Sequence, residues 1–313
     1  MTHLAAPGFF FLMGTGMVLL AHSRRKMAWK PRRITLHLLV RGLILIGLQF
    51  LVVNRAWEMA PGGWGLRWYV GVLVALGGTM ILGAFLITQR PEVLLILTPL
   101  LFLGTEVLTP SPDQWDQSFS PVLRALLIPG GNQDFWVNYP ILPWLGLVTF
   151  GMLFGNWLLE EPRKAFGRAR QIGIVLLLLF LPLRALDGFG NLRPRAGDGW
   201  IDFFNLVKYP PSLTFALLTM GVNLRLLDVF YRIGRRWGSL LAPLTVYGRT
   251  PLFFYLLHLF FYAGLGNWLV PKGTDLPGML PYWLLGLVLM APLCYQYGKL
   301  KARQPVNSWL HFF

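Results

Sequence analysis

Apolar runs of transmembrane length, separated by short charged or Pro- and Gly-rich segments, dominate the chain. Nine such runs lie at about 7–22, 34–53, 68–88, 92–108, 141–159, 171–186, 211–230, 250–270 and 280–298. A helix rises about 1.5 Å per residue, so each run crosses most or all of a hydrocarbon core roughly 30 Å thick. The pattern predicts an all-α fold, a polytopic integral membrane bundle of about nine transmembrane helices, with residues 1–313 in a single domain.

The first apolar run does not have the pattern of a secretory signal peptide. Such a signal carries its positive charge before the apolar stretch, whereas here the six Lys/Arg residues of segment 24–33 follow it. The stretch from Pro7 to Ala21 carries no charge. It therefore predicts the first transmembrane helix.

Composition supports the same class. The chain is 55% hydrophobic and 13% charged, against roughly 25% charged residues in soluble domains. The formal net charge of +15 fits a cytoplasmic boundary and anionic headgroups better than nucleic acid, so the expected partner is the lipid bilayer, with no nucleic acid. A single cysteine, Cys294, excludes an internal disulfide framework and a Cys-based zinc site, and no metal site is predicted.

The distribution of Lys and Arg predicts the orientation of the bundle. With the N-terminus outside, 19 of the 28 Lys/Arg residues fall on the inner side and 8 outside, and Arg41 lies within a span. The positive-inside rule then indicates an N-out, C-in topology. An outer N-terminus without a cleavable signal is unusual before so many positive charges, which favours a further helix upstream.

Ionisable groups within a span tend to face the bundle interior or water, and three candidates are selected on that ground: His258, the pair His37 and Arg41, and His3. His258, in "GRTPLFFYLLHLFFYAG", is about eight residues into its helix and hence roughly 12 Å from the inner end, near the midplane. It is either functional or a neutral imidazole that hydrogen-bonds across helices. His37 and Arg41, four residues apart, share a helix face near the inner boundary, where they could also snorkel. His3 stands at the outer mouth, either solvated or functional.

The long outer loops, 109–140 and 187–210, are rich in Pro, Gly and Trp. Asp134, Asn138 and Tyr139 precede the helix that begins "PILPWLG", and Lys208 and Tyr209 belong to "KYPPS". We expect these stretches to converge at the outer mouth and contact an acceptor, although prolines that merely start helices would give a similar pattern.

Other motifs point to packing rather than chemistry. Gly151 and Gly155 in "GMLFG" favour close helix packing within the bundle over a dimer face, and a homodimer stays an open alternative. HExxH, GxSxG and P-loop patterns are absent from the sequence.

Five stretches, taken in order, resemble a known family. They are "THLAAPGFFFLMG" (2–14), "RG" (41–42), "NYPILPWLG" (138–146), "KYPPS" (208–212) and "GRTPLFFYLLH" (248–258). Together they are similar to the bacterial relatives of heparan-alpha-glucosaminide N-acetyltransferase, within the wider class of transmembrane acyltransferases. The resemblance covers nearly the whole chain. It implies an enzyme of the bacterial inner membrane that takes an acetyl or other acyl group from cytosolic acyl-CoA, as co-substrate rather than bound cofactor. The acceptor it implies is a cell-envelope glycan or another small amine or alcohol outside.

The chain also departs from that family. Relatives begin with another helix, which carries an Arg-Gly pair, and an outer loop that holds the functional histidine of the animal enzyme. Neither that helix nor most of that loop is present here, which indicates either a late start codon or the loss of part of the site. His3 belongs to the "TH" motif at the end of that loop and does not obviously correspond to the functional histidine.

Roles follow from the resemblance and from the chemistry of histidine, whose pKa near 6.5 suits a general base. His258 is the first candidate for the base and His3 the second, while Arg249, Arg41 and His37 are candidates for binding the coenzyme. We expect a water-accessible cavity, open to the inner face and lined by His258, Arg249 and Arg41. The alternative function is a membrane transporter or scaffold without chemistry.

Overall fold

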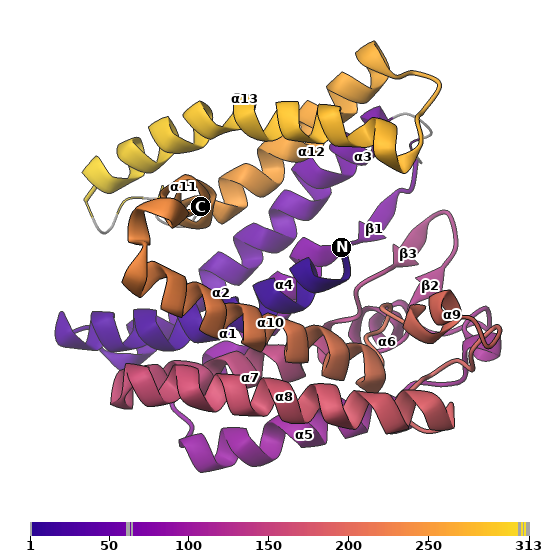
Figure 1. Ribbon diagram of the computed structural model, residues 1–313, viewed down its shortest axis with the longest axis horizontal. Coiled ribbons are helices and arrows are strands. Elements are labelled where there is room, and N and C mark those ends of the chain that lie inside the picture. The colour runs from indigo at the N-terminus through magenta and orange to yellow at the C-terminus, as the bar shows by residue number, and fades with distance from the viewer. Residues whose placement is uncertain (1, 61–62, 64, 306–307, 309, 311–313) are drawn as a thin grey trace. The chain divides into compact units, whose positions relative to one another are not determined.

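The computed structural model describes residues 2–60, 63, 65–305, 308 and 310. Figure 1 shows that helices make up most of the molecule. The long helices are α1 (Thr2–Lys26), α2 (Pro31–Leu48), α5 (Pro91–Leu108), α7 (Ile141–Glu160), α8 (Pro162–Leu186), α10 (Leu213–Arg236), α12 (Pro251–Leu269) and α13 (Leu276–Arg303). The short helices are η1 (Gln49–Val53), α3 (Asn54–Met59), α4 (Val72–Leu86), η2 (Pro112–Gln114), α6 (Pro121–Leu126), α9 (Trp200–Phe204), η3 (Gly238–Leu241) and α11 (Ala242–Arg249).

Eight helices in the described part of the chain are long and apolar enough to cross a membrane. They are His3–Lys26, Pro31–Met59, Pro91–Leu108, Ile141–Glu160, Pro162–Leu186, Leu213–Arg236, Pro251–Leu269 and Leu276–Arg303. The protein is therefore a polytopic helical membrane protein, as the hydrophobic pattern predicts. The ninth predicted run, 68–88, differs: its first three residues form a strand, and the helix that follows, α4, has only 15 residues. The N-out, C-in topology stays a prediction.

Local chemistry sets several of the helix ends. Pro91, Pro162 and Pro251 lie in the first turn of α5, α8 and α12, where the missing N–H has no intrahelical partner to lose and the fixed φ suits a helix. Asp187 ends α8 in the left-handed conformation, with φ 52°. Asp275 caps α13, because its carboxylate accepts a hydrogen bond of 2.9 Å from the Gly278 N–H.

The chain divides into two compact units, neither of which is one continuous stretch of sequence. Unit 1 contains the residues up to Ile46 and Arg67–Tyr231, and unit 2 contains Gly47–Leu66 and the residues from Arg232 onward. The single-domain interpretation of residues 1–313 stays a prediction.

Helix α7 forms the centre of unit 1, where α1, α4, α5 and α8 pack against it. Glycines let the α1 and α7 backbones meet: a Cβ on Gly14 would strike the Val148 carbonyl, and one on Gly151 would strike the Phe11 carbonyl. The Thr15 hydroxyl bridges the two helices by donating to the Gly151 carbonyl oxygen at 3.0 Å.

The GxxxG pair on α7 serves this packing. Gly151 faces α1 as described, and a Cβ on Gly155 would meet Val18 and Thr15 on the same helix. The structure thus confirms close packing within the bundle as the use of this motif.

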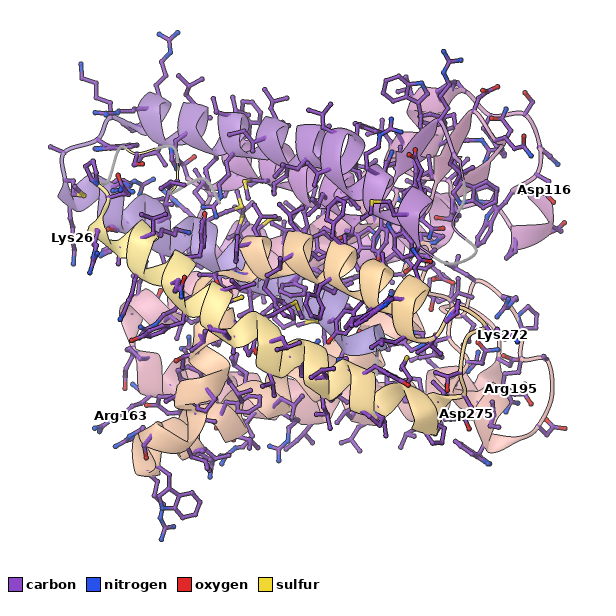
Figure 2. The ribbon with its side chains drawn as sticks, turned by 90° about the horizontal axis from the view of Figure 1, so that it is seen from above. Lys26, Asp116, Arg163, Arg195, Lys272 and Asp275 are labelled. Carbon is purple, nitrogen blue, oxygen red and sulfur yellow. The ribbon has the colours of Figure 1, made fainter. Side chains whose placement is uncertain are left out.

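The two ends of unit 1 differ in charge (Figure 2). Lys26 and Arg163 lie at one end, and Asp116 and Arg195 lie at the opposite end. We call the first the basic end, made of residues 24–33 and 160–170, and the second the loop end, made of residues 67–71, 109–140 and 187–212. This grouping matches the sides to which the sequence assigns these loops.

A small sheet lies at the loop end, an addition to the expected helices. Its strands are β1 (Trp68–Val70), β2 (Gly130–Gly131) and β3 (Phe135–Val137), in the order β1-β3-β2. β1 and β3 are parallel, with Tyr69 opposite Trp136, and β2 pairs antiparallel with β3. The sheet fixes the segment that leads into α7.

Unit 2 is built around the pair α12 and α13, which α11 and α3 also contact. The Tyr262 hydroxyl of α12 donates to the Trp283 carbonyl of α13 at 2.7 Å. Asn267, near the end of α12, donates to the Met59 carbonyl of α3 at 2.7 Å. The first bond joins two consecutive helices, and the second joins helices that are far apart in the sequence.

Candidate functional site

Two tyrosines from distant loops meet at the loop end of unit 1. The hydroxyl oxygens of Tyr139 and Tyr209 lie 3.1 Å apart, and their rings form an edge-to-face pair with centroids 4.8 Å apart. The sheet holds Tyr139 in place, since its N–H and that of Asn138 both donate to the Val70 carbonyl of β1. The Tyr209 loop closes on itself through a bond from the Ser212 N–H to the Val207 carbonyl.

Lys208 adds a positive charge to this pair. Its Nζ lies 4.9 Å from the Tyr209 ring centroid and 5.9 Å from that of Tyr139, within range of a cation–π interaction. None of the ion pairs formed among the described residues involves Lys208. Its ammonium group is therefore held by aromatic faces rather than by a carboxylate.

His3, at the start of α1, belongs to the same neighbourhood. Its ring packs edge-on against Phe215 of α10, with centroids 5.7 Å apart, and it is close enough to Lys208 to interact with that charge. The next residue, Leu4, accepts a hydrogen bond of 3.0 Å from Asn223 of α10 through its carbonyl oxygen. The loop end thus gathers the "TH", "NYP" and "KYPPS" stretches. We call His3, Tyr139, Lys208 and Tyr209 the loop-end cluster.

Asn138 connects the cluster to the sheet. Its Nδ2 donates to the Tyr69 hydroxyl at 3.1 Å, and its Oδ1 accepts from Trp136 Nε1 at 3.4 Å. Burial raises the pKa of Tyr69 to about 12, which the neighbouring Tyr209 reinforces and the bond from Asn138 partly offsets. Tyr69 is thus a neutral phenol at physiological pH.

Asp134 has a different position. It lies exposed beside the small sheet, where its backbone oxygen accepts from the Trp68 N–H at 3.0 Å. The strand pairing thus fixes its backbone and leaves its carboxylate toward solvent.

His258, on α12, lies in unit 2 among aromatic rings. Phe254, Tyr255 and Tyr262 have ring centroids 5.4, 5.4 and 6.3 Å from its own. Its Nδ1 is hydrogen-bonded to the backbone carbonyl oxygens of Phe254, at 3.2 Å, and Tyr255. Because a carbonyl oxygen only accepts, Nδ1 carries the proton and the basic lone pair of the neutral ring is on Nε2.

The candidates for binding the coenzyme are divided between the units. Arg249 is exposed at the end of α11 in unit 2. His37 and Arg41 lie on α2 in unit 1, both partly buried, and the His37 ring packs edge-on to Trp29 at 5.8 Å. The predicted cavity lined by His258, Arg249 and Arg41 would require residues of both units and stays a prediction.

Two charged residues, Arg184 and Glu106, hold the loops of the loop end together. The sequence analysis did not identify either of them. Arg184, with 1% of its surface exposed, donates to the Phe203 and Asp202 carbonyls at 2.8 and 2.7 Å and to the Asn191 side chain at 2.8 Å. Glu106 accepts from the backbone N–H groups of 190, 192 and 213 at 3.0, 3.1 and 3.3 Å. The signal was available, because both residues lie within the last turn of a span, where an ionisable group needs a partner.

Metal ligation has no candidate group in the described part of the chain, where no three His, Cys, Asp or Glu side chains gather closely enough to hold an ion. Cys294 is a buried free thiol in α13.

Comparison with known proteins assigns the chain to a family. The sequence model of heparan-alpha-glucosaminide N-acetyltransferase, catalytic, matches residues 1–187. That range contains His3 and Tyr139 of the loop-end cluster. The comparison with curated proteins gives no match. Because the matched range covers more than half of the 313 residues, the chain belongs to the family of heparan-alpha-glucosaminide N-acetyltransferase catalytic domains.

Proposed function

We propose that the protein is an acetyltransferase of the bacterial inner membrane that moves an acetyl group from cytosolic acetyl-CoA to an amine or hydroxyl group outside. The acceptor is a cell-envelope glycan or a small sugar-like molecule. The observation that carries this proposal is the family match over residues 1–187. Eight helices of membrane-spanning length support the location of the reaction in a membrane.

The loop-end cluster supports the acceptor side of the proposal. Tyr209 is partly exposed and offers an aromatic face, and Lys208 offers a cation without a carboxylate partner among the described residues. Tyr139 is buried, and its hydroxyl lies 3.1 Å from that of Tyr209, so it would hold Tyr209 in position. Aromatic faces with a few polar groups are the usual lining of small-molecule sites. Asn138 and Asp134 would contact the acceptor from the side of the sheet.

The tautomer of His258 supports its role as general base. In the proposed step, Nε2 removes a proton from the acceptor amine or hydroxyl, whose N or O atom attacks the thioester carbonyl carbon. The C–S bond then breaks, and the CoA sulfur leaves with the electron pair and takes up a proton. His3 is the alternative base, since it already lies in the loop-end cluster.

Positive side chains would hold the donor. The phosphates of acetyl-CoA are polyanionic, and Arg249, Arg41 and His37 are the candidates for binding them by charge-assisted hydrogen bonds. The six Lys/Arg residues of segment 24–33 would raise the local concentration of the donor at the basic end.

The test is acetyl transfer by the purified protein in proteoliposomes, with radiolabelled acetyl-CoA and glucosamine or short glycans as acceptors. We expect His258→Ala to lower kcat by about 10²- to 10⁴-fold, as loss of a general base does. The matched control is His22→Ala, which removes an exposed histidine of α1. Loss of activity in His3→Ala but not in His258→Ala would assign the role of general base to His3. Absence of both transfer and thermal stabilisation by CoA would favour a transporter or scaffold.

A further inference from the structure

Unit 1 contains an apolar crevice of about 250 Å³ between four membrane-spanning helices. The four helices are α5, α7, α8 and α10, which are labelled in Figure 1. The lining residues are Thr98, Pro99, Phe102 and Leu103 of α5, Phe150 of α7, Leu176 of α8, and Leu213, Ala216, Leu217 and Met220 of α10. An apolar space of this size stays dry and accepts hydrocarbon.

The only hydroxyl in the lining is already satisfied. Thr98 Oγ1 donates to Thr149 Oγ1 at 3.0 Å, and Thr149 in turn donates to the Gly146 carbonyl at 2.9 Å. The crevice therefore presents methyl, methylene and ring surfaces, and it has no free group to bind a sugar or a phosphate.

The depth of the lining residues places the crevice in one half of the bilayer. Thr98 lies ten residues before the end of α5, and Leu176 ten residues before the end of α8, or about 15 Å from those ends. Phe150 and Met220 lie nine and seven residues after the starts of α7 and α10. All four of these helix ends lie at the loop end, so the crevice extends from there toward the middle of a core about 30 Å thick.

The residues that line the crevice differ in exposure, and the exposed ones indicate where a ligand could enter. Phe150, Ala216 and Met220 are buried and form the floor, whereas Leu103 is 42% exposed and Pro99 is also exposed. The exposed rim lies on α5, and the surroundings of this rim in a membrane are lipid chains. Ala216 and Met220 lie on a different face of α10 from Phe215, which contacts His3.

We propose that this crevice binds one hydrocarbon chain of a bilayer phospholipid, taken from the leaflet at the loop end. Membrane depth, a dry lining and an exposed rim together favour this occupant over a polar ligand. The proposal does not depend on acetyl transfer, so its failure would leave the proposed function unchanged.

The test uses the full-length protein in nanodiscs of phosphatidylethanolamine and phosphatidylglycerol that contain a phospholipid with a photoactivatable diazirine in one chain. After irradiation, mass spectrometry locates the labelled peptides. We expect labelling to concentrate on the segments 98–103 and 213–220, above the level on other lipid-facing helices such as α13. Equal labelling of all lipid-facing helices would overturn the proposal.

A pair of variants tests the entrance. Leu103→Trp places a larger ring on the exposed rim. We expect it to lower labelling of 213–220 about fivefold, the loss expected when roughly one buried methylene group of the chain is displaced. The matched control is Leu100→Trp, at an exposed leucine of α5 outside the lining. Undiminished labelling in Leu103→Trp would overturn the proposal. Displacement of the label by palmitoyl-CoA but not by unlabelled phospholipid would also overturn it, by assigning the crevice to a donor chain.

Discussion

The hydroxyl oxygens of Tyr139 and Tyr209 lie 3.1 Å apart although 70 positions separate the residues in the chain. Tyr139 lies in the short segment between strand β3 and α7, and Tyr209 lies in the loop before α10. Lys208 lies within 6 Å of both rings, at 5.9 and 4.9 Å from their centroids. The contact thus joins the loop that contains "NYP" to the loop that contains "KYPPS", two of the stretches on which the family resemblance rests.

The hydroxyl pair gives the first prediction. Tyr139→Phe or Tyr209→Phe removes one hydroxyl, and each should lower the free energy of unfolding by about 1 kcal/mol, the usual net value of a hydrogen bond. The double variant should cost little more than either single variant, because the same bond is lost. Unfolding in mixed micelles, followed by circular dichroism, measures the three values. Tyr295→Phe, at an exposed tyrosine of α13, is the control. Additive losses would show that the hydroxyls do not interact.

Lys208 gives a prediction about the acceptor. Lys208→Ala should raise the KM for the acceptor about tenfold, equivalent to roughly 1.4 kcal/mol, because the cation and its contact with the rings are lost. The KM for acetyl-CoA should not change. Initial rates with each substrate varied separately measure both constants. The control is Lys272→Ala, at an exposed lysine of unit 2. A change confined to the KM for acetyl-CoA would remove Lys208 from the acceptor site.

Glycines on α1 give a sharply matched pair of variants. Gly14→Ala should strongly destabilise unit 1, because the new methyl group would strike the Val148 carbonyl and both backbones would have to separate. Gly16→Ala, two residues away, has nothing within 4 Å of the new Cβ and should be neutral or slightly stabilising, since alanine favours helix. Thermal denaturation monitored by light scattering compares them. Equal melting temperatures would contradict the close approach of α1 and α7.

Tyr69 predicts a loss of stability in alkali. Its pKa is about 12 in the folded protein and 10 for an ordinary tyrosine. A group whose pKa is raised by folding contributes stability that is fully present below the unfolded value and is lost as pH rises to the folded value. Stability should therefore fall by about 2–3 kcal/mol between pH 10 and 12 on account of Tyr69.

The variant Tyr69→Phe isolates this effect, because the other tyrosines and lysines titrate in both proteins. Unfolding free energies measured at intervals across the same pH range should converge, with the wild type losing its advantage toward pH 12. Parallel curves would mean that the Tyr69 hydroxyl is not buried as described.

Much of the fold could be predicted from the sequence, because the length and polarity of a span are local properties that the thickness of the bilayer imposes. The eight long helices lie on predicted runs, and the GxxxG pair on α7 packs within the bundle as expected. The prediction for 68–88 was too long, because residues 68–70 pair with β3, a partner more than 60 residues away. A window of local hydropathy contains no information about such a partner.

Tertiary structure decided which of the candidate residues meet in the loop-end cluster. The sequence alone selected His3, Tyr139, Lys208 and Tyr209, but the same reasoning selected Asp134, whose strand pairing leaves it exposed. The sequence did not indicate that Arg184 and Glu106 would hold the surrounding loops through backbone groups that lie up to 107 positions away. The length of a span and its low content of charge can be predicted from the sequence, because both follow from the cost of transferring each residue into lipid. The partner of a buried charge depends instead on which loops close over it, and only the packed chain determines that closure.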